Sequence, residues 1–131
     1  MQKRNINPWQ WQDPLSFSQA VEVEASGKVL YCAGQLSVDI NGNPLHIGDM
    51  RKQINQAFDN LDQLLAQSGY TLQHVVRLNY YTTDMPAFLA AYDVVTERLR
   101  ECPIKPSGCL LGFSALATPG LMIEIEATAV R

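Results

Sequence analysis

The sequence predicts one α+β domain in which a mixed β-sheet carries two helices on one face. Two observations lead to this prediction. Strand patterns and helix patterns follow one another in the order β-β-α-β-α-β-β, so helices separate two blocks of strands. The chain has 131 residues, of which 47% are hydrophobic, and this fits one domain that spans residues 1–131.

The first two strands are expected at residues 17–24 and 29–36. Residues 17–24 alternate in polarity with the period of a half-buried strand. Residues 29–36 form a nearly continuous apolar run, which suits a central strand covered on both faces. Because the turn-forming residues 25–28 lie between them, we expect the two strands to pair as a hairpin.

The first helix is expected to begin after Asp49 and to end before Gly69. Asp49 is a suitable N-cap, and Gly69 stands where a left-handed residue ends many helices. The apolar residues between them recur at spacings of four, three and four: Ile54, Phe58, Leu61 and Leu65. This pattern predicts an amphipathic helix that packs one face on the sheet.

A third strand and a second helix follow. Residues 75–83 are rich in β-branched and aromatic side chains, as expected of a strand. Asp84-Met85-Pro86 then starts a helix, because proline is favoured in the first helical turn. Its apolar stripe consists of Phe88, Tyr92, Val95 and Leu99, and Pro103 lies just beyond its expected end.

The last two strands are expected at residues 106–116 and 121–130. The segment Ala117-Thr118-Pro119-Gly120 between them has turn-forming residues. Proximity in the chain predicts that these strands form an antiparallel hairpin.

The apolar residues predict that the sheet has more surface than two helices can cover. The residues that suggest this surplus are Gln35, Leu36, Leu78, Tyr80, Leu110 and Met122. We therefore expect another subunit to cover part of the sheet.

Composition narrows the classes of function. The net charge of −3 gives no general attraction to phosphates, which argues against nucleic-acid binding. The apolar runs are too short to cross a bilayer, and no apolar segment follows the basic residues near the N-terminus, so we expect no membrane partner and no secretory signal. An odd set of 3 cysteines without Cys-x-x-Cys spacing indicates reduced thiols and a cytoplasmic protein.

Glu124 and Glu126 share one face of the last strand, about 6.5 to 7 Å apart. That spacing suits a general acid and base. It equally suits a solvated strand face, with Ile123, Ile125, Ala127 and Ala129 in the core, and spacing alone favours this second interpretation.

The other candidate residues have ordinary structural explanations. His46 and His74 have no acidic or thiol neighbours at ligand spacing, so we expect no metal site. The apolar neighbours of Cys109 indicate a packed thiol. Gly34 and Gly108 mark either a ligand approach or a tight contact between strands, and the sequence leaves both open. No sequence motif for a cofactor is present, and none is expected.

Four segments in this order resemble the Rid (YjgF/RutC-like) family. They are AGQLSVD at 33–39, QINQAFDNL in the first helix, VVRLNYYTTDM at 75–85, and KPSGCLLGFSALATPGLMIEIEATAV at 105–130. The resemblance runs from about residue 17 to the C-terminus and leaves residues 1–16 as an N-terminal arm. It implies a chorismate-mutase-like (YjgF-like) fold and a homotrimer with small-molecule sites in clefts between subunits.

The resemblance also implies site residues. Glu124 matches the glutamate that positions the hydrolytic water, and Gly34 and Cys109 match residues that line the pocket. Phe17 stands where the family often has tyrosine, and Tyr92 stands where asparagine is usual.

One departure from the family concerns the substrate carboxylate. In members that hydrolyse 2-aminoacrylate and its imine, an arginine in a Pro-x-Arg-x-Cys segment holds that carboxylate. Here the segment is taken as Pro106-Ser107-Gly108-Cys109, with Gly108 at the arginine position. Glycine supplies neither the charge nor the planar fork of a guanidinium.

The function expected from the resemblance is therefore hydrolysis or deamination of an unidentified imine- or amide-like metabolite, without efficient 2-aminoacrylate deamination. A non-catalytic small-molecule-binding or regulatory module is the alternative. An RNA-acting protein, a ribonuclease or translation inhibitor, is a third reading, which the acidic charge balance disfavours.

Overall fold

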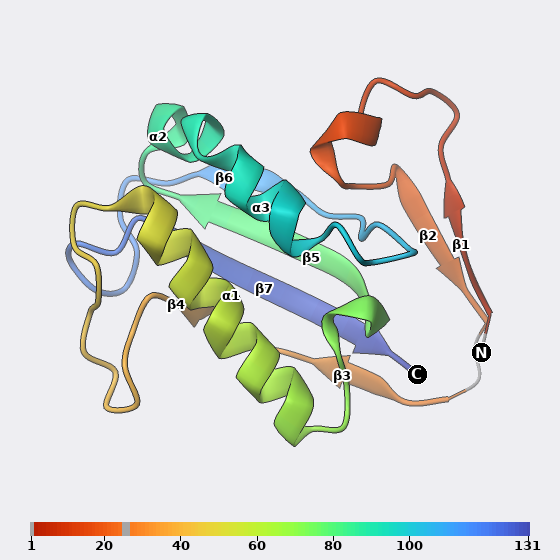
Figure 1. Cartoon of the computed structure of the whole chain (residues 1–131), viewed down its shortest axis with the longest axis horizontal. Helices are drawn as coiled ribbons and strands as arrows, with labels where there is room; N and C mark the ends of the chain where they lie inside the picture. Colours follow the sequence, from red (N-terminus) through yellow and green to blue (C-terminus); the bar gives the residue numbers. More distant parts are fainter. Residues whose placement is uncertain (1, 25–26) are drawn as a thin grey trace.

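A 5-stranded mixed sheet forms the centre of the protein, and helices cover one of its faces (Figure 1). This computed structural model describes residues 2–24 and 27–131. The strands are β1 (Lys3–Ile6), β2 (Ala20–Val23), β3 (Val29–Tyr31), β4 (Gln35–Leu36), β5 (Val75–Thr82), β6 (Leu110–Gly112) and β7 (Ile123–Val130). The helices are α1 (Met50–Gln67), α2 (Met85–Ala90) and α3 (Tyr92–Arg98), with short 3₁₀ turns η1 (Asp13–Leu15) and η2 (Leu72–His74).

Helix α1 confirms the prediction from its pattern. The Asp49 carboxylate accepts a hydrogen bond from the Lys52 amide at 3.0 Å, and Gly69 has a φ of 81° just beyond the C-terminus. The four residues of the predicted apolar stripe, Ile54, Phe58, Leu61 and Leu65, are all 0% exposed. Across the part of the chain that the structure describes, no helix has both the length and the apolarity needed to cross a membrane.

The second predicted helix is two helices, α2 and α3, which meet at Ala91. The Ala91 amide donates to Phe88 O at 3.1 Å as well as to Ala87 O at 3.2 Å, so the last turn of α2 tightens before α3 begins. The predicted stripe still faces the sheet, because Phe88, Val95 and Leu99 are 0% exposed.

Both predicted hairpins are wrong. Strand β2 pairs with β1 in a separate 2-stranded sheet, while β3 and β4, the two halves of the predicted strand 29–36, both pair with β7. Part of the turn predicted between the first two strands, residues 25–26, lies outside the described residues. At the other end of the chain, β6 pairs in parallel with β5, and β7 lies between β3 and β5.

The physical reason is the long crossover. Strands β5 and β6 are joined through α2 and α3, and such a helical connection places parallel strands side by side. The predicted strand 106–116 shortens to β6, and the remaining connection to β7 is too long for a tight turn. Strand β7 instead pairs along its length with β5 (Figure 1).

Alternation along β7 separates the core from a polar surface. Ile123, Ile125, Ala127 and Ala129 are at most 1% exposed and face the helices, as the solvated-face interpretation predicted. Glu124 and Glu126 point to the opposite side, which we call the open face. Their partners on β5 are Tyr81 and Asn79.

The residues that were predicted to remain uncovered by the helices are buried or half-buried in the structure. Leu78 is 2% and Tyr80 is 6% exposed under the helices, while Leu110 and Met122 pack against the same core, and Gln35 and Leu36 are half-buried. The break at Ala91 lets α2 and α3 lie side by side with α1 over the sheet (Figure 1). The large apolar side chains that remain exposed are Ile6, Trp9, Trp11, Leu15, Val29, Tyr31, Ile40, Ile47, Leu89, Leu111 and Phe113.

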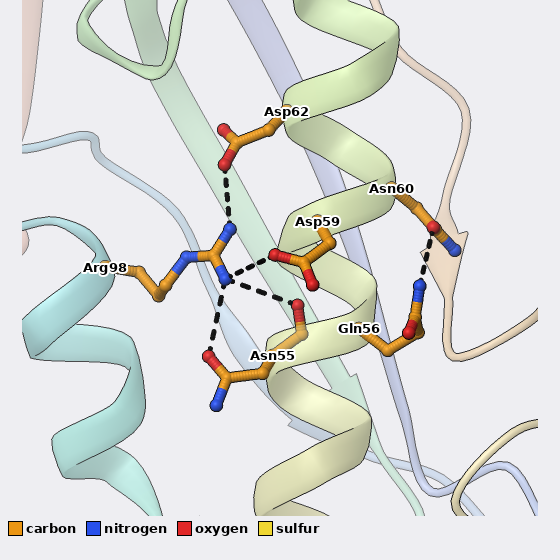
Figure 2. A network of polar contacts seen from close by, with 6 residues as sticks. All are labelled: Asn55, Gln56, Asp59, Asn60, Asp62 and Arg98. Atoms are coloured by element: carbon orange, nitrogen blue, oxygen red, sulfur yellow. Dashed lines mark hydrogen bonds and ion pairs between the residues drawn. The ribbon is translucent and has the colours of Figure 1, made fainter.

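A polar network joins α3 to α1 through Arg98 (Figure 2). The guanidinium forms ion pairs of 2.7 Å with Asp59 and 2.7 Å with Asp62, and donates to the Asn55 backbone at 3.4 Å. It also lies 5.3 Å from the centre of the Phe58 ring. Because the Arg98 side chain is only 21% exposed, these contacts are less screened than ordinary surface pairs.

Replacing Arg98 with alanine is therefore expected to destabilise the protein by about 1 to 3 kcal/mol, since it removes two ion pairs and the cover over Phe58. Arg100→Ala is the matched control, because this arginine is 66% exposed and both its ion pairs measure 3.3 Å. It should change stability by less than about 0.5 kcal/mol. Urea midpoints measure both variants, and equal midpoints would show that the network does not hold α3 on α1.

Candidate functional site

Glu124 is held against the backbone of Gly34. Leu36 of β4 is opposite Glu124 of β7, which brings the chain just before β4 under the carboxyl group. A Cβ atom at Gly34 would lie 2.6 Å from Glu124 Cδ, so a larger residue would push this carboxyl group out of its present position. Burial, and secondly repulsion by Glu126, raise the pKa of Glu124. Within the described residues no hydrogen bond or ion pair stabilises its charge.

Glu126 has the opposite environment. Its Oε1 accepts hydrogen bonds from Asn79 Nδ2 at 3.0 Å and from the Tyr81 hydroxyl at 2.7 Å. These bonds, that of Asn79 first, lower the pKa of Glu126. Two carboxyl groups on one strand thus have pKa values shifted in opposite directions, an arrangement typical of sites where one group exchanges protons and the other stays ionised.

Glu124 opens into a depression with apolar walls, which we call the Glu124 hollow. Its other lining residues are Tyr81, Phe113, Ala115, Leu116 and Ala117. The rings of Tyr81 and Phe113 lie 5.7 Å apart and meet edge to face at 63°. The hollow therefore combines one carboxylate with two aromatic rings.

A second depression, the Tyr92 pocket, lies at the edge of the sheet where β5 and β6 meet the N-terminal arm. Its lining residues are Ser16, Phe17, Leu78, Tyr80, Tyr92, Pro106, Gly108, Cys109 and Leu110. The Tyr92 hydroxyl donates to Leu15 O at 2.7 Å, and burial raises the pKa of Tyr92 to about 12. The Tyr92 phenol therefore stays uncharged near neutral pH and does not act as an acid or base there. Its hydrogen bond holds the N-terminal arm.

The candidate residues from the sequence fall into two groups in one chain. Gly34 and Glu124 contact each other at the Glu124 hollow, and Phe17, Tyr92, Gly108 and Cys109 line the Tyr92 pocket. One side chain links the groups: Asn79 Oδ1 accepts from the Cys109 amide at 2.9 Å while Asn79 Nδ2 donates to Glu126.

Sequence reasoning missed Asn79, Tyr81 and Phe113. The sequence did contain a signal for Asn79 and Tyr81, because both side chains can form hydrogen bonds and both lie on one face of an otherwise apolar strand. Phe113 follows β6 and carries no comparable signal. Its place depends on the parallel pairing of β6 with β5.

Gly108, assigned from the resemblance to the arginine position, is packed against the backbone of β5. A Cβ atom at Gly108 would lie 2.7 Å from the Leu78 carbonyl carbon, so no side chain can leave this position, and the glycine reflects a tight strand contact. Counted back from Cys109, Pro-x-Arg-x-Cys places the arginine at Ser107. The Ser107 hydroxyl donates to Val76 O at 3.3 Å. The arginine is absent, but serine replaces it and Gly108 creates no empty space.

The thiol prediction also needs correction. Cys109 is exposed, because its side chain lies on the open face and not in the core, while Cys32 and Cys102 are buried, and all three are free. Lys105 does not substitute for the arginine in this chain, because its ammonium donates to Leu99 O at 2.7 Å. Among the residues that the structure describes, no group of three or more His, Cys, Asp or Glu side chains could hold a metal ion.

This fold and site define a small α+β protein with a carboxylate site on its sheet, and comparisons identify the family. The family model described as endoribonuclease L-PSP matches residues 12–131. The chain belongs to this family, which confirms the Rid (YjgF/RutC-like) resemblance and the YjgF-like fold.

Three relatives illustrate the similarity. The crystal structure of YyfB, a Rid family protein from Yersinia pestis, superposes with a TM-score of 0.87 at 38% identity and covers 100% of both chains. Mmf1, a mitochondrial protein of Schizosaccharomyces pombe, is 34% identical over 98% of this chain and 76% of its own. The 2-iminobutanoate/2-iminopropanoate deaminase of Dermatophagoides farinae is 32% identical over 87% of this chain and 84% of its own.

Proposed function

We propose that this protein hydrolyses the C=N bond of a small imine, with Glu124 as the group that activates water. The observation that supports this most is the partly buried Glu124 carboxylate, which has no charge partner among the residues that the structure describes, while Glu126 beside it is fixed by two hydrogen bonds. The similarity to a relative named as an imine deaminase points to the same chemistry.

In the proposed reaction, water adds to the carbon of a protonated imine. Glu124 accepts a proton from the water as the C–O bond forms, and then returns a proton to the nitrogen of the tetrahedral adduct. The C–N bond breaks to expel ammonia, which takes up the hydroxyl proton, so that a carbonyl compound and ammonium leave. No redox partner is required.

The substrate of this reaction is proposed to lack a carboxylate. Serine at position 107 cannot form the two charge-assisted bonds of a guanidinium, and a lost contact of that kind costs about 2 to 5 kcal/mol of binding, equivalent to about thirty- to several-thousand-fold. The residues that line both depressions include no lysine, arginine or histidine.

Imines generated in situ by oxidases test the substrate class, with semicarbazide as a competing trap whose product is followed by absorbance. The protein should accelerate loss of an aryl or alkyl imine without a carboxylate at least about tenfold more than that of 2-iminopropanoate. Equal acceleration of the 2-imino acid would contradict this preference. No acceleration of any imine would leave the non-catalytic binding module as the better explanation.

We further propose that neighbouring copies in a homotrimer complete the site and that the protein works in the cytoplasm. Exposed Leu111 near the Glu124 hollow supports a subunit contact, and three free cysteines support a reducing compartment. Light scattering should give three times the chain mass of 14.6 kDa, and a monomer would contradict the trimer.

A ribonuclease function, suggested by the description of the family model, is not supported by the charge of this chain. Binding to RNA depends on basic residues that neutralise phosphates, whereas the net charge here is −3.

A further inference from the structure

The Glu124 hollow has the chemistry of a cation-binding site. From this we infer, on the basis of the proposed function, that it binds its substrate as a flat organic cation, a protonated imine without a carboxylate, between the Glu124 carboxylate and the rings of Tyr81 and Phe113. The specificity-determining residues of this reaction are then Tyr81 and Phe113.

The carboxylate supplies the charge for this recognition. Glu124 is half-buried, and the other residues that line the hollow are uncharged. A cation placed there would form an ion pair with Glu124 that no described residue of this chain forms. An anion would meet Glu124 with nothing to offset the repulsion.

The aromatic rings add a second attraction. The faces of tyrosine and phenylalanine rings attract cations, and delocalised cations such as iminium groups also stack on them. Tyr81 is opposite Glu124 on the neighbouring strand, and its ring meets the Phe113 ring at 5.7 Å. Both rings therefore lie beside the carboxylate, as recognition of a flat cation requires.

The Tyr81 ring is held in place by its own hydroxyl. This group donates to Glu126 at 2.7 Å, and Asn79 donates to the same oxygen, so the phenol has a fixed direction. Asn79 is only 8% exposed, so the second donor to Glu126 is fixed by packing. Tyr81 therefore offers the hollow its ring and keeps its hydrogen-bonding group for Glu126.

The charged groups around the hollow also favour a positively charged ligand. Glu124 and Glu126 lie on β7, and Arg77 of β5 is the cation close enough to influence Glu126. The exposed Cys109 of the β6 side is close enough to Tyr81 to affect the pKa of that phenol. At Glu124 itself the charged group that acts is the second carboxylate, Glu126, so the described surroundings of the hollow favour a cation.

Three probes with the same skeleton test the inference by NMR titration of the full-length protein: benzamidinium, benzamide and benzoate. Benzamidinium should bind at least about tenfold more tightly than benzoate, with benzamide between them. Glu124→Gln should remove the advantage of benzamidinium over benzamide. Phe113→Ala should weaken benzamidinium about three- to tenfold, and because this ring is 48% exposed its loss leaves no core cavity.

The matched control is Tyr31→Ala. Tyr31 is an 80% exposed aromatic residue on β3, outside the hollow, and its loss should leave all three affinities unchanged. Benzoate binding as tightly as benzamidinium would overturn the inference, as would an unchanged benzamidinium affinity in the Glu124 and Phe113 variants. Absence of binding by every probe would also overturn it, because a neighbouring copy would then occupy the hollow.

The probes test the cation site independently of the hydrolase proposal, since none of them is readily hydrolysed. If imines are not turned over but benzamidinium binds as expected, the hydrolase proposal is wrong and the cation site stands. If imines are hydrolysed but the order of the probes is reversed, the hydrolase stands and the cation site is wrong.

Discussion

Replacing Glu124 with glutamine should lower kcat/KM for imine hydrolysis by about 100-fold or more, because the amide cannot accept a proton from water. The change preserves shape, so the amide should still lie over Gly34. The measurement is the semicarbazide competition assay with the best imine of the panel. Glu101→Gln removes the same charge from an 81% exposed side chain and should leave the rate unchanged.

A pH profile separates loss of a base from a general disturbance of the site. Burial and Glu126 raise the pKa of Glu124 above its usual value of 4.5, and the base must be ionised to act. The wild-type kcat/KM should therefore fall as pH falls through that raised pKa, and the residual activity of Glu124→Gln should not show this decline. A variant that keeps the wild-type rate and its acidic limb would show that Glu124 is not the base.

The Glu124→Gln change should lower activity but should not lower the stability of the folded protein. A carboxyl group with a raised pKa in the folded protein favours the protonated state there, so its contribution to stability is present below the unfolded pKa and is lost as pH rises through the folded pKa. Glutamine mimics the protonated form at all pH values. Glu124→Gln should therefore unfold at the same or a higher urea concentration than wild type near neutral pH, so a loss of activity cannot be explained by unfolding.

Local patterns in the sequence predicted most of the secondary structure. The stripe from Ile54 to Leu65 and the cap at Asp49 predicted α1 because both signals act within a few residues. Pairing of the strands was harder to predict. The hairpin expected from the proximity of residues 106–116 and 121–130 gave way to parallel pairing of β5 and β6, which depends on the helical crossover and on contacts far apart in the chain.

The same limit applied to the site. The resemblance identified Glu124 and Gly34, which the structure places in contact. Asn79 and Tyr81 belong to β5, and their relation to Glu126 follows from the register of β5 and β7, which single-residue patterns do not contain. The tight packing at Gly108 could not be predicted for a related reason, since only the position of the Leu78 carbonyl shows where a side chain at 108 would point.

Gly108→Ala should destabilise the protein by about 3 to 5 kcal/mol. The added methyl group would overlap the Leu78 carbonyl, which is backbone and cannot rotate away. Relief requires β6 to move from β5, which strains the hydrogen bonds from Leu78 N to Ser107 O and from Tyr80 N to Cys109 O, both 2.8 Å. Overpacking costs about 1 to 3 kcal/mol, and each weakened bond adds about 1 kcal/mol.

Gly112→Ala, at the end of β6, is the control, because a Cβ atom there would meet Met85 Cε at an ordinary 3.6 Å. It should change stability by less than about 1 kcal/mol. Urea unfolding of both variants gives the comparison. Equal stability of the two would mean that the segment just before β6 does not lie against Leu78, and position 108 would then be able to carry a side chain. A selective loss at Gly108 would instead show that the chain before β6 is packed too closely against Leu78 for residue 108 to carry a side chain.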